Sequence, residues 1–254
     1  MLPTLFISHG SPQLVIMQHE VSDFLKQLPK MFEKPKYIII VSAHWVSHGL
    51  KILAHKEPNI IYDFYGFPKE LYDKKYPLKN DINRVEEVIA LLENHGLHVE
   101  KSISREGYDH GVWAPLSLMY ENADIPVIQL SMPIGKNTNK LLKIGEALSS
   151  LRDETLIIGS GNMTHNLYDS DMSDVAAPVK EYARVFRDEI VKKIEKGDVD
   201  LLRETSYVKE NHPTLEHFLP IFIAMGASKS KIGKAIFDVY MYANQSMEMI
   251  VFKD

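Results

Sequence analysis

Histidines stand just after apolar runs at three places, and they are the residues best suited to chemistry. The runs LFIS, IIIVSA and LIIGSGNMT precede His9, His44 and His165 respectively. Any one of them alone suits a hydrogen-bonded loop residue. Three together favour one shared site, because ligands of open α/β sheets bind at the carboxyl ends of the strands. Converging imidazoles predict a metal site.

Two more histidines each follow a carboxylate, in the pairs Asp109-His110 and Glu216-His217. We expect Asp109 to orient the imidazole of His110 and to fix its tautomer. The alternative is that Asp109 caps a helix while His110 faces water. Thr214 predicts the start of a helix that runs to about residue 226, with Glu216 and His217 in its first turn.

The elements that must position these histidines alternate between strand and helix. Strands are expected at residues 5–8, 37–42, 50–54, 97–101, 126–131, 155–160, 238–243 and 247–252. Helices are expected at residues 15–28, 80–95, 137–151 and 177–196, with a short one at 199–204. Without a linker or an internal repeat, this alternation predicts an α/β fold in a single domain over residues 1–254.

Composition narrows the class of function. The 254 residues include 34 acidic and 29 basic side chains, a formal charge of −5, without the basic patches of a nucleic-acid binder. Cysteine is absent, so any metal must be bound by nitrogen and oxygen ligands. We expect neither a signal peptide nor a membrane span, and therefore a cytoplasmic protein whose partner is a small molecule.

An aromatic segment, Ile61–Pro68 (IYDFYGFP), ends in a turn signal. It is predicted to be an ordered loop over a pocket rather than a strand. An ordinary hydrophobic plug of the core is an equally good interpretation of its composition.

Five motifs, taken together and in this order, resemble the class III extradiol ring-cleavage dioxygenases. The resemblance is greatest to the DOPA 4,5-extradiol dioxygenase type. The motifs are Ser8–Pro12 (SHGSP), Ser42–Trp45 (SAHW), Asp109–Gly111 (DHG), Gly159–Asn166 (GSGNMTHN) and Glu216–Pro220 (EHFLP). The aromatic loop is also typical of that branch.

The resemblance implies a three-layer α/β domain with a central mixed sheet flanked by helices, and one divalent metal per chain. Its metal ligands would be His9, His44 and His217, with His165 as acid/base and possible fourth ligand, and His110 as a catalytic residue that contacts the substrate. Ser11 and Tyr65 are further expected substrate contacts. Fe(II) is expected for activity, with Zn(II) as an alternative occupant. The substrates would be O2 and a catechol such as DOPA, and the protein a monomer or small homo-oligomer.

Glu216 and His217 compete for one place at the metal. General chemistry of non-heme Fe(II) favours two histidines and a carboxylate, which nominates Glu216. Neighbouring side chains of a helical turn point about 100° apart, so only one of the two is expected to bind the metal. The resemblance favours His217, and we adopt it. Two other classes of protein fit the same histidines: a zinc hydrolase and a non-enzymatic metal-binding protein.

Overall fold

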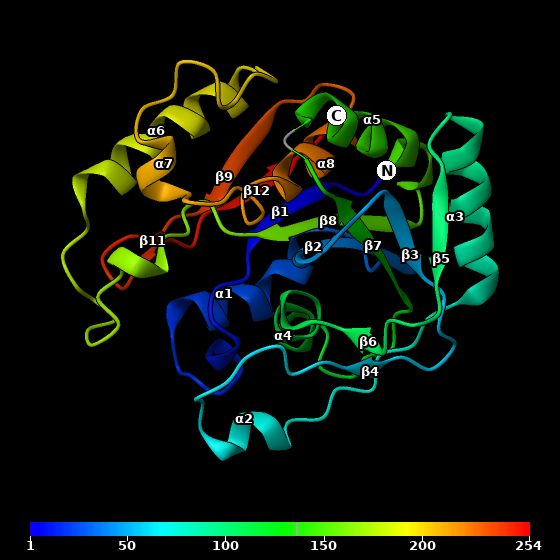
Figure 1. The fold of residues 1–254 in the computed structure, drawn as a ribbon, viewed down its shortest axis with the longest axis horizontal. Coiled ribbons are helices and arrows are strands. Elements are labelled where there is room, and N and C mark those ends of the chain that lie inside the picture. Colours follow the sequence, from blue (N-terminus) through cyan, green and yellow to red (C-terminus); the bar gives the residue numbers. More distant parts are fainter. Residues whose placement is uncertain (136) are drawn as a thin grey trace.

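The computed structural model describes residues 1–135 and 137–254 and is built on an eight-stranded mixed sheet (Figure 1). From edge to edge its strands are β5 (Val99–Ser102), β3 (Leu50–Leu53), β7 (Val127–Pro133), β2 (Tyr37–Ser47), β8 (Thr155–Gly161), β1 (Thr4–Ser8), β12 (Met249–Phe252) and β9 (Gly233–Phe237). The four central strands β7, β2, β8 and β1 are parallel. Antiparallel pairs β3–β7, β1–β12 and β12–β9 make the sheet mixed, as predicted.

Helices cover both faces of this sheet. The α-helices are α1 (Glu20–Gln27), α2 (Lys69–Asp73), α3 (Ile82–Asn94), α4 (His110–Met119), α5 (Thr138–Leu148), α6 (Glu181–Glu195), α7 (Val208–Asn211) and α8 (Pro220–Gly226). The 3-10 helices are η1 (Pro12–Val15), η2 (Leu28–Met31), η3 (Ser149–Leu151) and η4 (Leu167–Asp169). Two small ladders pair β4 (Asn59–Ile60) with β6 (Gly107–Tyr108), and β10 (Tyr240–Met241) with β11 (Gln245–Ser246). None of the helices in the described part of the chain has the length and apolar character needed to cross a bilayer.

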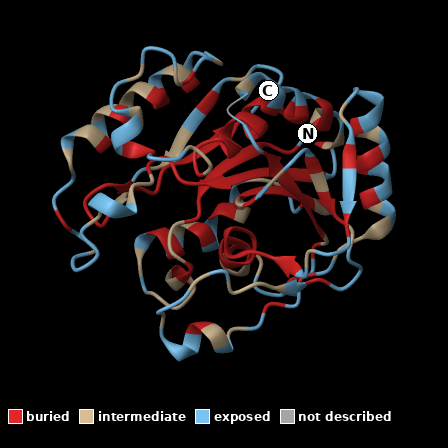
Figure 2. Ribbon diagram, viewed as in Figure 1, coloured by how far each residue is buried: buried red, intermediate tan, exposed pale blue. Residues whose placement is uncertain are grey.

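Alternating apolar residues of the central strands build two cores. On β2, Ile38 and Ile40 point to the face covered by α1 and α4, whereas Ile39 and Val41 point to the face covered by α3, α5, α6 and α8. All four side chains are almost fully buried. Such a period of two places successive side chains on opposite faces of a strand. Figure 2 shows the result, with buried central strands between helices that are exposed on their outer sides.

Several predicted boundaries were wrong. The expected helix 15–28 is shortened to α1, whose N-cap His19 accepts a hydrogen bond from the backbone N–H of Val21, and only Val15 of the expected range lies in η1. Residues 201–204 form turns instead of a helix, and the expected strand 238–243 shrinks to β10. Strand β9 was missed, because Lys234 interrupts its apolar pattern at the edge of the sheet, where charge protects an open edge from pairing.

The expected helix start at Thr214 was also wrong. Residues 213–219 form bends and turns, and α8 begins only at Pro220. Proline is well tolerated at the first position of a helix, since it needs no backbone N–H there. His217 therefore lies in a turn that leads into α8.

Two glycines allow this turn to lie directly against β8. A Cβ atom at Gly161 would lie 2.0 Å from the carbonyl oxygen of His217, and one at Gly159 would lie 2.2 Å from that of Pro220. The same His217 carbonyl accepts a hydrogen bond of 2.8 Å from the backbone N–H of Asn162. The glycines at the end of β8 thus determine where the backbone of His217 lies.

Replacing Gly161 by alanine should lower the free energy of unfolding by roughly 3 kcal/mol, the upper end of the cost of overpacking, because a backbone oxygen cannot rotate away. Denaturant unfolding measures this change. Gly49→Ala is the control, since its Cβ would meet no atom within 4 Å and only its positive φ opposes alanine, at about 1 kcal/mol. Equal losses in the two variants would show that the close approach is not what demands Gly161.

Candidate active site

Five histidines from distant parts of the chain meet at the carboxyl edge of the parallel strands. They come from the end of β1, from β2, from the start of α4, from the loop after β8 and from the turn before α8, and are His9, His44, His110, His165 and His217. Their rings pack together, with centroid separations from 3.5 Å to 5.5 Å among the contacting pairs. The predicted convergence of strand ends is therefore present in the structure.

Three of the ring nitrogens face one another. The Nε2 atom of His44 lies 3.1 Å from Nε2 of His9 and 3.2 Å from Nε2 of His217. His9 and His217 are buried, and His44 is 21% exposed at the cavity. This arrangement puts His44 in the middle of the three.

The outer nitrogen, Nδ1, of each of these rings lies beside an oxygen that can accept a proton. Ser160 donates its hydroxyl hydrogen to the carbonyl of Gly111, so its oxygen accepts from Nδ1–H of His9 at 2.9 Å. Carboxylate oxygens of Asp63 and Glu216 lie 3.4 Å and 3.3 Å from Nδ1 of His44 and His217. These acceptors favour a proton on Nδ1 of His9 and of His217, which leaves their Nε2 lone pairs facing His44, and the Asp63 carboxylate beside Nδ1 of His44 favours the same tautomer there.

Inward lone pairs fit a cation. Burial, and then the neighbouring histidines, lower the pKa of His9 and His217 well below the usual value. Burial, and then the charge of His110, lower the pKa of His44 to about 4. All three rings are thus neutral near pH 7, and neutral imidazole is the form that binds a metal.

Two groups of side chains could each hold a metal ion. His9, His44 and His110 offer ligand atoms within 4.8 Å of one another, as do His165, Glu216 and His217. Because the two groups adjoin, the geometry provides a site with three histidines and leaves further imidazoles beside it. Divalent transition metals prefer such nitrogen donors.

The partner of His110 is Asp63, not Asp109. The Oδ1 atom of Asp63 accepts from Nδ1–H of His110 at 2.9 Å and from its backbone N–H at 3.0 Å. Burial opposes ionisation of Asp63, but the hydrogen bond and the charge of His110 outweigh it and lower its pKa to about 2. One carboxylate thus contacts both His110 and His44. An aspartate in an otherwise apolar aromatic loop was the sequence signal for this role, and we missed it.

Asp109 does not orient His110; it occupies the N-cap position of α4, as the alternative held, but its side chain bonds elsewhere. Its buried carboxylate accepts hydrogen bonds from Ser42, Arg105 and Gln129, at 2.5 Å, 2.7 Å and 2.6 Å. It makes no side-chain capping bond to α4. His110, which the alternative exposed to water, is only 6% exposed. Asp109 points into the sheet because three donors of neighbouring elements meet there.

His165 stacks on His217, with ring centroids 3.5 Å apart and planes 9° from parallel. Its backbone N–H donates to the carbonyl of Asn211 at 2.9 Å, which holds the loop after β8. Burial lowers its pKa to about 4, opposed by Glu216 and aided by His110. His165 is therefore neutral at pH 7 and lies beside the three facing nitrogens.

A cavity of about 230 Å³ opens over the histidines. The residues that line it are His9, Gly10, Ser11, Pro12, His44, Phe64, Phe67, His110, Asn162, His165, Leu167, Met172, His217, Tyr242 and Gln245. The aromatic loop therefore does lie over a pocket. Ser11 lines the cavity as expected, but Tyr65 is 91% exposed and is not part of the lining. This geometry does not support a substrate contact from Tyr65.

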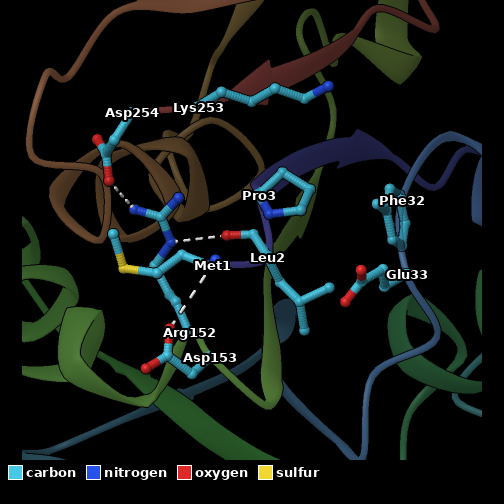
Figure 3. Close-up of a pocket in the computed structure, with 9 residues that line it drawn as sticks. All are labelled: Met1, Leu2, Pro3, Phe32, Glu33, Arg152, Asp153, Lys253 and Asp254. Carbon is cyan, nitrogen blue, oxygen red and sulfur yellow. Dashed lines mark hydrogen bonds and ion pairs between the residues drawn. The ribbon is translucent and has the colours of Figure 1, made fainter.

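A larger cavity, of about 450 Å³, lies at the opposite ends of the parallel strands (Figure 3). Arg152 is its most prominent cation, but the guanidinium already donates to the carbonyls of Leu2 and Ala227 and pairs with Asp254. The guanidinium thus links the segment before β1, the end of α8 and the residue that follows β12 by two positions. The histidine cavity is the one with convergent chemical groups.

His212 gives the stability of the protein a dependence on pH. Its Nε2–H donates to the carbonyl of Met163 at 2.9 Å, Nδ1 has no partner among the described residues, and burial lowers the pKa to about 4. A histidine with a depressed folded pKa stabilises the fold above its unfolded pKa, near 6.5, and this stability is lost as the pH falls toward 4. Between pH 7 and pH 4 we expect His212 to account for a loss of up to roughly 3 kcal/mol.

Unfolding curves of the wild type and of His212→Phe, recorded at pH 7 and pH 4, test this. Phenylalanine keeps an aromatic ring beside Phe186 and Phe218, whose rings already contact His212, and it cannot titrate. The variant should lose less stability on acidification than the wild type. Identical losses would mean that His212 does not contribute to the acid sensitivity.

Buried histidines at the strand ends of a mixed α/β sheet, beside a cavity with aromatic walls, form a site that could hold a divalent metal next to a small ligand. The sequence model of the catalytic LigB subunit of aromatic ring-opening dioxygenase matches residues 3–251. The chain belongs to this LigB family.

The chain is similar in sequence to named dioxygenases and similar in fold to a solved structure. The chain is 37% identical to the 4,5-DOPA dioxygenase extradiol of Beta vulgaris, over 89% of this chain and 86% of that protein. It is 32% identical to the Escherichia coli K12 protein of the same name, over 89% and 85%. The crystal structure of the uncharacterized protein JW3007 from Escherichia coli K12 superimposes over 100% of both chains, with a TM-score of 0.82 and 25% identity.

The family match confirms the resemblance to the extradiol dioxygenases. The protein is an aromatic ring-opening dioxygenase, so O2 and a small aromatic molecule are its substrates. The match favours a dioxygenase over the two alternatives, a zinc hydrolase and a non-enzymatic metal-binding protein.

Proposed function

We propose that this dioxygenase cleaves a catechol next to its two hydroxyl groups, with one Fe(II) bound by His9, His44 and His217. The observation that supports this most is the meeting of the three Nε2 atoms, with Nδ1 of His9 and of His217 hydrogen-bonded outward and Nδ1 of His44 beside the Asp63 carboxylate. When bound, Fe(II) supplies the Lewis acidity and the redox chemistry that let a catechol react with dioxygen. Zn(II) suits the same donors but has no redox chemistry.

His217 is the third ligand in this proposal, in preference to Glu216. The Glu216 carboxylate lies on the Nδ1 side of the His217 ring, whereas Nε2 of His217 faces His44. Thr214 also donates to the same carboxylate oxygen, at 2.9 Å. Glu216 is thus placed to hold the ring of His217, as outer carboxylates do for metal-binding histidines.

His165 is the acid/base in this proposal, and His110 holds a substrate oxygen. A neutral imidazole at the substrate can take the second phenolic proton of the catechol and return it later in the reaction. His165 lines the cavity and is neutral, which suits this role. Nδ1 of His110 is held by Asp63, so its Nε2 is left to contact the substrate.

Other parts of the proposal concern the cavity wall and the domain. Ser11, Phe64 and Phe67 are the proposed substrate contacts, and the two phenylalanines replace Tyr65 in this role.

We also propose that residues 1–254 work as one catalytic domain, because the histidines of the site span residues 9 to 217 and the last strands complete the same sheet.

Oxygen uptake after anaerobic loading with Fe(II) tests the proposed function. We expect one O2 consumed per catechol, together with the visible absorbance of a ring-opened semialdehyde. DOPA is the first catechol to test, since it is named in the relatives. Zn(II)-loaded protein is the control and should consume no O2. Absence of uptake with every catechol in fully Fe(II)-loaded protein would contradict the proposal.

A further inference from the structure

One buried amide in the wall of the histidine cavity has a hydrogen-bond donor without an acceptor. Asn162 is only 1% exposed, and its Nδ2 atom has no partner among the described residues. Other buried side-chain atoms also lack a partner, but in the part of the chain that the structure describes Asn162 is the one such residue that lines the cavity. Leaving a buried donor unpaired is costly, which suggests that its acceptor arrives with a ligand.

A backbone contact decides which end of this amide is free. The backbone N–H of Gly10 donates to Oδ1 of Asn162 at 3.0 Å. Because a backbone N–H can only donate, the atom that faces Gly10 must be the oxygen, and the unpaired end must be the NH2 group. The free end of the side chain therefore offers two N–H hydrogens and can bind only an acceptor.

Asn162 lies at the floor of the cavity, next to the proposed metal ligands. Its backbone N–H donates to the carbonyl of His217 at 2.8 Å, and Gly10, which binds its side chain, directly follows His9. The rim lies elsewhere and includes Met172, which is 58% exposed. A catechol that binds with its hydroxyl groups toward the histidines would place its ring oxygens near Asn162 and its substituent near the rim.

A ring oxygen of a bound catechol is an acceptor of the right kind. Once it has lost its proton it is an anion, and hydrogen bonds to a charged acceptor are stronger than neutral ones. His110, already proposed to hold a substrate oxygen, packs against His44 with ring centroids 3.9 Å apart. Asn162 is instead held by Gly10 and His217. Since a catechol has two oxygens, His110 and Asn162 can hold one each.

We propose that the side-chain NH2 group of Asn162 donates a hydrogen bond to a ring oxygen of the bound catechol and stabilises the ionised form of that oxygen. This inference rests on the proposed function, to which it adds a substrate-binding residue. The amide stays neutral in this role and gives up no proton. Loss of the donor should weaken catechol binding by about 10-fold to 100-fold, the worth of a hydrogen bond to a charged group.

Side-chain NMR of the wild-type protein loaded with Zn(II) tests this contact without turnover. Zinc is diamagnetic, and the NH2 signals of Asn162 can be assigned through its own backbone. On anaerobic binding of 4-methylcatechol, one of these proton signals should move downfield as the hydrogen bond forms. Asn166 is the internal control and should not move, because its Nδ2 already donates to the carbonyl of Glu210 outside the cavity lining. Unchanged Asn162 signals with the catechol bound would overturn the inference.

Variants of Asn162 measure the contribution of the donor to binding. Asn162→Asp removes the NH2 group but keeps an oxygen for the N–H of Gly10, so the loop should hold its shape. In the Zn(II)-loaded protein it should raise the dissociation constant of 4-methylcatechol by at least about tenfold. The neutral variant Asn162→Ala should do the same, which separates the missing donor from the added charge. Asn166→Asp is the charge-matched control in the same loop and should leave binding unchanged. Equal effects of the two aspartate variants would overturn the inference.

Two catechols locate the oxygen that the amide binds. DOPA and 4-methylcatechol share their ring hydroxyls, but only DOPA carries a charged substituent. Asn162→Ala should therefore weaken the binding of both by the same factor. An effect confined to DOPA would place the amide at the substituent and overturn the inference. If Fe(II)-loaded protein cleaves no catechol, the proposed function fails, while these binding measurements still decide the role of Asn162. A protein that binds no catechol at all would overturn both.

Discussion

Replacing His44 by alanine should lower the affinity for the metal by more than 100-fold and abolish ring cleavage. His44 is the middle member of the three, since its Nε2 lies 3.1 Å and 3.2 Å from those of His9 and His217. Loss of a ligand costs more than loss of an outer hydrogen-bond partner, which typically lowers metal affinity by about 10-fold to 100-fold. Metal content after reconstitution and dialysis, together with a competition titration, measures the change.

Comparing Glu216→Gln with His217→Ala decides which of these two residues binds the metal. Glu216→Gln removes only the carboxylate behind the His217 ring, so it should keep stoichiometric metal with an affinity reduced by about 10-fold to 100-fold. His217→Ala should lose the metal as His44→Ala does. A glutamine variant without metal, beside a His217 variant that retains it, would show that the carboxylate is the ligand.

Replacing His165 by glutamine should leave the metal in place and lower kcat by about 10²-fold to 10⁴-fold, the usual contribution of a general acid/base. Glutamine keeps hydrogen-bonding groups in the cavity but cannot exchange a proton near neutral pH. The backbone anchor from His165 to Asn211 is unaffected by the change, so the loop should hold its shape.

Single-turnover oxygen uptake and anaerobic catechol binding separate the chemical step from binding. His48→Gln, at an exposed histidine outside the cavity, is the control and should behave as the wild type. Near-normal kcat in His165→Gln would move the proton transfer to another group, and His110 is then the first candidate. Loss of the metal in this variant would instead make His165 a ligand.

Sequence alone determined the framework of the protein. Apolar runs that alternate with helical patterns predicted the α/β class, because their periods of 2.0 and 3.6 residues place side chains on defined faces. The runs before His9, His44 and His165 predicted that these residues share an edge, because parallel strands end on the same side. Both expectations concern local pattern and simple topology, and both are confirmed.

Tertiary structure decided which side chain meets which. Asp63 reaches His110 across 47 positions of sequence, whereas the adjacent Asp109 turns away toward Arg105 and Gln129. Adjacency in sequence suggested Asp109 as the partner of His110. A buried donor, however, bonds to the acceptor that lies next to it in the folded protein, and for His110 that acceptor is Asp63.

The same reason applies to the turn before α8 and to the cavity. Contact between the His217 backbone and Gly161 fixes the turn, and local propensity at Thr214 predicted a helix that packing did not allow. Within the aromatic loop, only the folded backbone decides that Phe64 faces the cavity while Tyr65 faces water. Local sequence determines which residues are available, and long-range packing, which no short motif encodes, determines how they are paired.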